Sequence, residues 1–483
     1  MTYRGRALAA LLLTGALAAA GCTEQTTQGK AVGPDTGKVG GMAVTHFESG
    51  LKADAPQPDV KVENATDSRE DKVAIATIAD VSDYWAEVMP RDFGMEFEQV
   101  KRLLSYDSNS DTAQLCGRSV QGELNAFYCP LEDAVAWDRG ELLPRLVKLY
   151  GDVAPITVLA HEYGHAVQHR LGEKAGIPQN GPEPKTIVLE AQADCFTGGY
   201  FRWIVEGKSK YFKVSTAEGL NAALSTMYLV RDAPGKLSAE MGAHGTAFDR
   251  TLAFQEGFEQ GPKNCAAYND QLLTERTTQF QFNKKDTARG EASIDEQTLQ
   301  LTKESLDDVF QGKGAPKVVT TGGTCPDGSG TPPTSYCPQD NTVAVNITTL
   351  AQIGTPIDRE REMGGEASAG KGDFAAFASF ASRYTLAVQK ANGKPIDNDM
   401  AALRTACLTG AWAKGAQERV KPDQIIIDLA PGDLDEAILE MLQPKSLIGS
   451  NVTGGQVPSG FLRVEAFRTG YLDGSEACGA AYQ

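Results

Sequence analysis

Four stretches in the first half of this 483-residue chain recur in the second half in the same order. The matched pairs are 127–137 with 335–345, 159–168 with 380–389, 190–199 with 401–410, and 253–268 with 466–482. Chance can supply one such match, but hardly four in one order. The repeat therefore predicts two homologous lobes, residues 71–272 and 273–483, that pack together and share one order of elements.

The cysteines follow the same repeat. Apart from Cys22 the chain has eight cysteines, and an even number favours disulfides over free thiols if the chain is exported, as residues 1–22 predict below. Two spacings recur between the lobes, 13 or 12 residues for a short pair and 70 or 71 for a long pair. They predict the bridges Cys116–Cys129, Cys195–Cys265, Cys325–Cys337 and Cys407–Cys478.

Apolar periodicity gives the coarse secondary structure. Residues 125–129 and 134–138 alternate and carry aromatic side chains, which is typical of short antiparallel strands, here joined through Pro130. Helical periodicity is found in 141–151, 155–176 and 186–206.

The stretch VLAHEYGHAVQHR, residues 158–170, holds three of the five histidines. On a helix, His161 and His165 lie four residues apart and project from one face, so they can bind one zinc ion. Glu162 completes an HExxH pattern and is placed to take a proton from metal-bound water. His169 lies about 12 Å of helical rise from His161 and is expected in packing or at the surface. The alternative is a helix that keeps the HExxH pattern for structural reasons alone.

A third metal ligand is expected on the next helix. The sequence EAQAD places Glu190 and Asp194 four residues apart on one face. Glu190 can complete a His₂Glu set with an open fourth position, and Asp194 can accept the other ring N–H of a ligating histidine. The alternative is that both are solvated helix carboxylates.

The motifs HEYGHAVQ, LEAQADCFTGGYF and HGTAFDRTLAFQEGFEQG, preceded by NAFYCPLEDAVAWD, resemble the bacterial neutral zinc metallopeptidase family of the gluzincin type. The resemblance covers most of residues 75–270. It implies Zn²⁺ bound by His161, His165 and Glu190, Glu162 as general base, and a peptide or protein substrate. It also suggests that strand 134–138 borders the cleft and aligns an extended peptide.

The expected fold class is α+β, mainly α. A zincin-like lobe with a small antiparallel sheet is followed by a second, homologous and degenerate lobe. His244 is a further candidate in the first lobe. It either stabilises the oxyanion of the transition state or makes a structural hydrogen bond in its loop.

The second lobe is predicted to bind no catalytic zinc. Residues 273–483 contain no histidine. The alignment sets five other residues at the metal-site positions: Ser382, Arg383, Leu386, Ala402 and Ala406. We expect this lobe to bury a face of the first lobe, to shape the cleft or to bind a protein partner.

The first residues predict export. Residues 1–22 combine a positive start, an apolar run and small residues that end at Cys22, which resembles the lipobox of a bacterial lipoprotein. Acylated Cys22 would anchor the chain by lipid at the outer face of the cell membrane. An ordinary signal peptide with an incidental cysteine is the alternative. Residues 23–70, rich in Gly, Thr, Asp, Pro and Lys, are expected to form a flexible tether.

The charge excludes one class of partner. A net charge of −17 argues against nucleic acid, because phosphate binding needs clustered Lys and Arg. The leading interpretation is a secreted, lipid-anchored zinc metallopeptidase. The alternatives are a zinc-containing but non-hydrolytic binding or regulatory lipoprotein, and a hydrolase of non-peptide amides or esters. Glu162 beside both histidines favours catalysis, since structural zinc needs no base.

Overall fold

The computed structural model describes most of the chain from residue 35 onwards. The described residues are 35–178, 184–237, 240, 242–276, 280, 282, 290–320, 322–364, 366, 370–418 and 428–483. These described residues belong to one compact unit. The predicted signal peptide with Cys22, and residues 23–34 of the predicted tether, lie outside the described residues.

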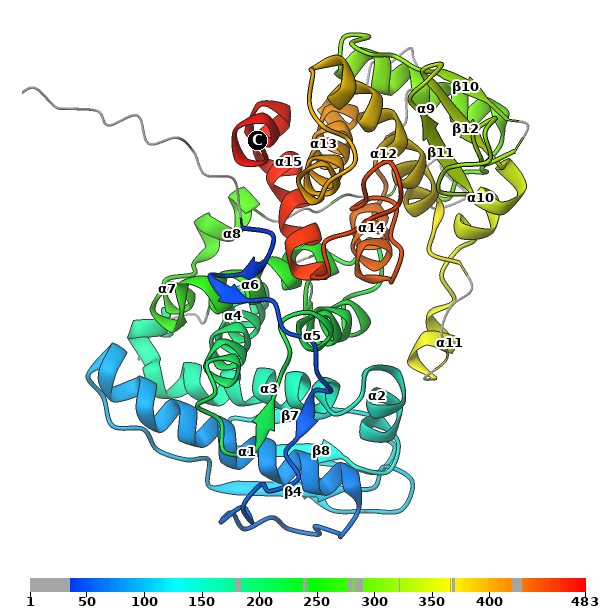
Figure 1. Cartoon of the computed structure of the whole chain (residues 1–483). Helices are drawn as coiled ribbons and strands as arrows, with labels where there is room; N and C mark the ends of the chain where they lie inside the picture. Colours follow the sequence, from blue (N-terminus) through cyan, green and yellow to red (C-terminus); the bar gives the residue numbers. More distant parts are fainter. Residues whose placement is uncertain are drawn as a thin grey trace, which may run out of the picture. The chain divides into compact units, whose positions relative to one another are not determined.

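Helices make up most of the regular structure (Figure 1). The first part of the chain contains α1 (Arg69–Val88), the π-helical turn η1 (Met89–Phe93), α2 (Leu142–Tyr150), α3 (Val153–Leu171), the 3-10 turn η2 (Gly172–Ala175), α4 (Thr186–Val205), α5 (Glu218–Leu229), α6 (Ala247–Gln260), α7 (Pro262–Ala266) and α8 (Asp270–Arg276). The later part contains α9 (Glu296–Val309), α10 (Ile347–Ile353), α11 (Arg359–Met363), α12 (Asp373–Ala391), α13 (Asp399–Glu418), α14 (Asp433–Leu442) and α15 (Gly460–Ala481). Within the described residues, no helix is both long enough and apolar enough to cross a bilayer.

The strands are short and form small sheets. They are β1 (Lys38–Val39), β2 (Met42–Ala43), β3 (Gly50–Leu51), β4 (Arg102–Tyr106), β5 (Gln114–Leu115), β6 (Arg118–Ser119), β7 (Ala126–Cys129), β8 (Ala134–Asp138), β9 (Phe212–Lys213), β10 (Lys317–Val319), β11 (Thr334–Cys337) and β12 (Thr342–Val345). The fold is therefore mixed, with many helices and small sheets, in agreement with the expected class.

A three-stranded sheet in the order β4–β8–β7 lies beside α3. β7 and β8 are antiparallel as predicted, with Phe127 opposite Ala136. β4 runs parallel to β8, so the sheet is mixed and not wholly antiparallel. The connection through residues 107–133 is long enough for the crossover that a parallel pair requires.

The order of this sheet corrects one expectation about the cleft. β8 is the central strand and is paired along both edges, so its backbone is not available to an added peptide. The edge strands are β4 and β7, and the outer side of β4 is already bridged by Glu63, which leaves β7, residues 126–129. A peptide that extends this sheet must therefore pair with β7 and not with residues 134–138.

A second three-stranded sheet has the same pattern of directions. Its order is β10–β12–β11, with β10 parallel to β12 and β11 antiparallel to it.

Two helix pairs cross closely through glycines. In the crossing of α4 and α6, a Cβ added to Gly198 would lie 1.9 Å from the carbonyl oxygen of Phe254. One added to Gly257 would lie 1.7 Å from the carbonyl oxygen of Cys195, so neither position has room for a side chain. The crossing of α13 and α15 has two glycines with equally close contacts, Gly410 and Gly470.

All four predicted disulfides are present. Their Cα–Cα distances lie between 5.4 and 5.8 Å, the usual range for this bond. The pairs are Cys116–Cys129, Cys195–Cys265, Cys325–Cys337 and Cys407–Cys478.

Residues 35–70 pack on the folded body. β3 pairs with β9, Leu51 opposite Phe212. The backbone N–H of Thr45 donates to the hydroxyl oxygen of Thr216 at 2.8 Å. The polar residues that suggest a tether form hydrogen bonds with the segment that precedes α5. The tether prediction is therefore wrong for the described part of 23–70.

The two parts of the chain share one apolar core. Phe258 of α6 packs on Phe461 of α15, with ring centroids 5.4 Å apart. Phe248 packs on Tyr471 at the same distance. The buried amide of Gln255 also donates to the carbonyl oxygen of Phe461 at 2.8 Å. The later part of the chain is therefore built into the body that carries the candidate site.

Candidate metal centre and active site

Helix α3 sets the positions of two histidines. Pro155 lies in its first turn, where the missing N–H costs no helical hydrogen bond. The helix ends at Gly172, whose φ of 51° favours glycine. His161 and His165 lie one turn apart, with ring centroids 4.8 Å apart.

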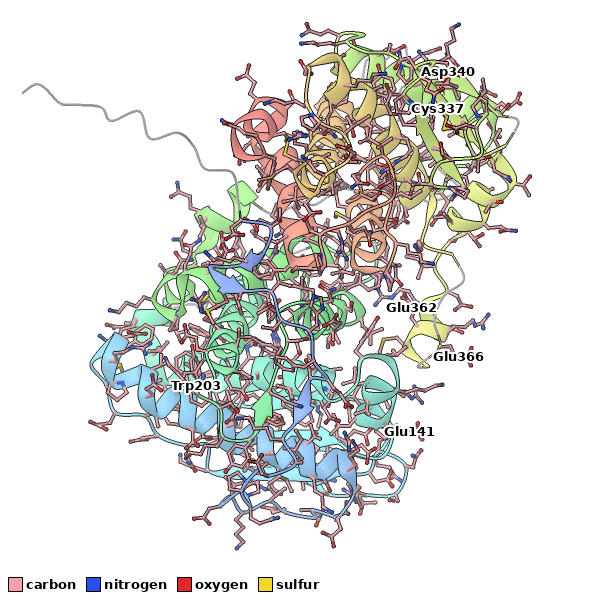
Figure 2. The ribbon with its side chains drawn as sticks, in the orientation of Figure 1. Glu141, Trp203, Cys337, Asp340, Glu362 and Glu366 are labelled. Carbon is pink, nitrogen blue, oxygen red and sulfur yellow. A yellow bond between two sulfur atoms is a disulfide. The ribbon has the colours of Figure 1, made fainter. Side chains whose placement is uncertain are left out.

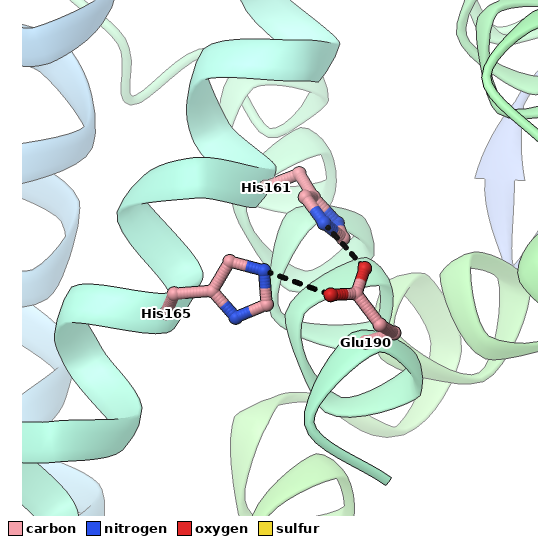
Figure 3. Close-up of side chains that lie close together, drawn as sticks. All are labelled: His161, His165 and Glu190. Atoms are coloured by element: carbon pink, nitrogen blue, oxygen red, sulfur yellow. Dashed lines mark hydrogen bonds and ion pairs between the residues drawn. The ribbon is translucent and has the colours of Figure 1, made fainter. Parts of the chain in front are cut away.

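Helix α4 brings a carboxylate to both imidazoles. The two helices approach closely at Gly164, where an added Cβ would lie 3.1 Å from the Cα of Ala193. Oε2 of Glu190 lies 3.1 Å from Nε2 of His161, and Oε1 lies 3.5 Å from Nε2 of His165 (Figure 3). One ligand atom from each of these three residues lies within 4.8 Å of the others.

Asp194 holds the other side of the His161 ring. Its Oδ1 lies 2.7 Å from Nδ1 of His161, and its side chain is fully buried. Arg250 of α6 binds the same carboxylate with two N–H groups, at 2.8 and 2.9 Å. The pair fixes the ring so that Nε2 faces Glu190.

Gln168 holds the ring of His165. Its Oε1 lies 3.0 Å from Nδ1 of His165, and its amide nitrogen donates to Oε1 of Gln192 at 3.1 Å. Both candidate histidine ligands therefore have an outer partner. The i, i+3 spacing of His165 and Gln168 is visible in the sequence, but a surface glutamine would have the same spacing. The sequence alone does not single out Arg250, which lies 56 residues from Asp194 on another helix.

Glu162 lies in a cleft beside the two histidines. Its Oε2 accepts a hydrogen bond from the backbone N–H of Tyr128 in the edge strand β7, at 3.2 Å. The cleft has a volume of about 240 Å³ and is lined by His161, Glu162, apolar side chains from several helices, and arginines. The arginines are Arg231, Arg250 and Arg359.

His244 lies at the edge of the same cleft. Its side chain is 49% exposed, and its Nδ1 lies 3.5 Å from Oδ1 of Asp232. Asp232 also accepts the backbone N–H groups of His244 and Gly245. The residue therefore makes a structural contact in its loop and also faces the cleft.

The two remaining histidines lie elsewhere. The ring of His169 packs near Tyr128, with centroids 5.5 Å apart, and His169 is not in the ligand group. His46 pairs with Glu218 at 2.7 Å in an exposed position.

The charges of these groups outweigh burial in setting the pKa values of His161 and Glu190. Burial lowers the pKa of His161, but the carboxylates of Asp194 and Glu190 outweigh it and raise this pKa to about 10. Burial raises the pKa of Glu190, but His165 and His161 outweigh it and hold this pKa well below its usual range. Glu190 is therefore ionised and available as a ligand.

The donor set fits zinc. Two imidazoles and one carboxylate, with room for water, are the ligands of catalytic zinc sites. Each histidine is oriented through its second ring nitrogen, as metal-ligating histidines usually are. A buried carboxylate between two imidazoles also needs a shared cation or proton to offset its desolvation.

Helix α12 of the later part carries no such set. Ser382, Arg383 and Leu386 are fully buried there. Arg383 donates to the carbonyl oxygens of Asn451 and Ser450, both at 3.1 Å, and burial lowers its pKa to about 9. Ala402 and Ala406 on α13 are fully buried as well. The positions that align with the metal site are therefore occupied by buried side chains that pack in the core and by a guanidinium that donates to backbone carbonyls.

Comparison with known proteins agrees with this geometry. Residues 27–268 match the family described as "putative neutral zinc metallopeptidase". The uncharacterized protein YpfJ of Escherichia coli K12 is 28% identical over 239 residues, which cover 46% of this chain and 81% of that protein. The uncharacterized protein Rv2575 of Mycobacterium tuberculosis H37Rv is 30% identical over 166 residues, 31% of this chain and 56% of that protein. No solved structure matches the chain.

Proposed function

The chain belongs to the neutral zinc metallopeptidase family, and we propose that it hydrolyses peptide bonds with one Zn²⁺ held by His161, His165 and Glu190. One observation carries the proposal. These side chains converge from α3 and α4, with ligand atoms within 4.8 Å of one another, beside a cleft that also contains Glu162.

The chemistry assigns a separate task to each residue. When bound, Zn²⁺ supplies Lewis acidity that lowers the pKa of water to about 7 and polarises a carbonyl. Glu162 accepts a proton from the attacking water at a carboxylate oxygen and passes it to the leaving amine. Asp194 keeps the His161 ring oriented throughout. His244 donates a hydrogen bond to the developing oxyanion from the ring nitrogen that does not face Asp232.

The substrate backbone is proposed to lie along β7. This strand forms the edge of its sheet, and Ala126 at its start lines the cleft. An extended peptide can add to such an edge through main-chain hydrogen bonds. The Tyr128 N–H is already used by Glu162, so pairing begins on the Ala126 side.

We further propose that residues 71–272 and 273–483 are homologous lobes and that the second has lost the metal site. The two three-stranded sheets have the same directions of strands. Each lobe has a helix crossing formed by a pair of glycines and one long disulfide, with sequence separations of 70 and 71. These likenesses support a duplication.

Export and lipid anchoring through Cys22 are also proposed. The support is the sequence before and at Cys22, together with four disulfides, which persist in oxidising compartments. The chain is then a lipoprotein at the outer face of the cell membrane.

The function is tested by turnover of a mixed peptide library. Wild type and Glu162→Gln are compared, with the zinc content of both determined. We expect cleavage by wild type and none by Glu162→Gln at equal zinc content, because an amide cannot accept the proton. A zinc-loaded wild type that cleaves no peptide in the library would contradict the proposal.

A further inference from the structure

A short helix from outside the family match reaches the cleft. The match ends at residue 268, whereas α11 begins at Arg359. Arg359 and Met363 nevertheless line the cleft that contains His161 and Glu162. One wall of the candidate active site is thus supplied by the later part of the chain.

Polar contacts hold α11 in this position. Arg359 donates to the carbonyl oxygens of Asp232 at 3.1 Å and of Arg231 at 2.9 Å. Glu362, labelled in Figure 2, lies 3.6 Å from the guanidinium of Arg231. Arg145 of α2 donates to the carbonyl oxygen of Met363 at 3.3 Å. The helix is therefore anchored on both sides of the cleft.

The arginines of the cleft differ in their partners. Arg250 is paired with Asp194, and Arg231 lies between Glu362 and Asp435 at 3.6 and 3.7 Å. Among the described residues, no carboxylate lies within 4.0 Å of the guanidinium of Arg359. Its two hydrogen bonds go to neutral carbonyls and use only part of its five N–H donors.

The charge of Arg359 is thus only partly compensated. Burial lowers the pKa of Arg359 and the neighbouring charge of Arg231 lowers it further, whereas the carboxylates of Glu362 and Asp435 offset part of this. Arg359 is only partly buried, so its guanidinium stays accessible to a group that enters the cleft. In a chain with a net charge of −17, this leaves a positive group at the cleft where an anionic group of a substrate can bind.

We propose that α11 is the selective wall of the substrate cleft, where Met363 packs on an apolar substrate side chain and Arg359 binds a carboxylate beside it. The proposal rests on the proposed peptidase function. Leu142 and Met227 are among the other apolar side chains that line the cleft. The carboxylate belongs to an acidic side chain or to a free C-terminus, since both present the same pair of oxygens to a guanidinium.

The size of the cleft agrees with a short recognised segment. Its volume of about 240 Å³ lies just below the range of about 300–1,000 Å³ that is typical of ligand pockets. It can therefore admit a short segment of a substrate.

The test uses binding, so that it does not depend on hydrolysis. Four labelled peptides share a glycine host with one leucine, followed by Glu or Gln, and end in a carboxylate or a carboxamide. Their affinities for zinc-loaded Glu162→Gln are measured by fluorescence anisotropy. We expect a carboxylate-bearing peptide to bind about tenfold more tightly than the Gln carboxamide, as for one charge-assisted contact. The peptide that shows the gain identifies the source of the carboxylate.

Variants at α11 then assign the effect to Arg359. Adding Arg359→Gln should abolish the carboxylate preference, and Arg359→Lys should keep part of it because the charge remains. Arg361→Gln is the matched control, since Arg361 lies on the same helix but is 59% exposed and pairs with Glu366. It should bind all four peptides like the parent.

Several results would overturn the proposal. They are equal binding of all four peptides, an unchanged preference in Arg359→Gln, or an Arg361→Gln variant as impaired as Arg359→Gln. An Arg359→Lys variant that has lost the carboxylate preference as fully as Arg359→Gln would show that Arg359 only holds α11 in place. If wild type hydrolyses the peptides without carboxylate preference, this proposal fails and the peptidase function stands. If binding is selective but wild type hydrolyses none of them, the peptidase function fails and this proposal stands.

Discussion

Asp194 lies 2.7 Å from Nδ1 of His161 and shares its carboxylate with Arg250. The carboxylate is fully buried, so its charge is offset by these two partners. The ring nitrogen that remains, Nε2, faces Glu190. Asp194 and Arg250 thus orient the His161 ring so that its free nitrogen points at the other proposed ligands.

Removing the charge of Asp194 should weaken zinc binding. We expect Asp194→Asn to lose about 10–100-fold in zinc affinity, because the ring of His161 is then less basic and less firmly oriented. Competition with a chromophoric chelator measures this. Asp133→Asn is the control, since Asp133 also pairs with an arginine, Arg170 at 3.0 Å, away from the ligands. Equal affinities for the two variants would contradict the assigned role.

The disulfide next to Asp194 should serve the site as well as the fold. Replacing Cys195 and Cys265 with alanine is expected to cost about 2–4 kcal/mol of unfolding free energy and to weaken zinc binding, because α4 is then less firmly held. The same change at Cys407 and Cys478 should cost a similar amount of stability, since the sequence separations are 70 and 71. Zinc affinity should be unchanged in that second variant. Urea unfolding and chelator competition provide the two readouts, and equal loss of zinc affinity in both would refute the link.

Asp80 should make the fold less stable as pH rises. It is buried on α1, accepts hydrogen bonds from Tyr200 and Ser209, and burial raises its pKa from 3.8 to about 6. As pH rises, Asp80 therefore loses its proton in the unfolded state before it does so in the folded state. Its contribution to the free energy of unfolding is full below pH 3.8 and falls until about pH 6. The loss is at most about 3 kcal/mol. Asp80→Asn should flatten this part of the profile in urea unfolding, and parallel profiles for variant and wild type would show that Asp80 is not responsible.

The predicted lipid anchor has a direct test. Cys22→Ser should move the protein from the membrane fraction to the soluble fraction of cells, because the acyl chains are no longer attached. Metabolic labelling with a fatty acid should mark wild type only. A variant that stays in the membrane fraction without label would show that something other than acylated Cys22 holds it there.

Much of the candidate site follows from local sequence patterns. The i, i+4 spacing places His161 and His165 on one face, and the same spacing pairs Glu190 with Asp194 on α4. Matched spacings in the two halves also select the disulfides out of many pairings, and all four are present. Predicting these features requires only the geometry of a single helix, or a comparison of the two halves of the chain.

Features that depend on packing between distant segments could not be predicted. Arg250 and Arg359 reach the cleft from separate helices, and no spacing connects them to His161. The edge position of β7 depends on β4, whose parallel pairing is decided by a long crossover. The polar composition of segment 35–70 predicts a tether, because nothing in the local sequence shows that its hydrogen-bond partners lie some 170 residues further on.

Zinc content measured on matched histidine variants tests the proposed site most directly. His165 and His169 lie one turn apart on α3, but only His165 belongs to the ligand group. Metal analysis of the purified protein should find one zinc per chain in wild type and in His169→Ala, and almost none in His165→Ala or Glu190→Ala. Full zinc occupancy in His165→Ala or Glu190→Ala, or a second tightly bound zinc in wild type, would contradict the assignment.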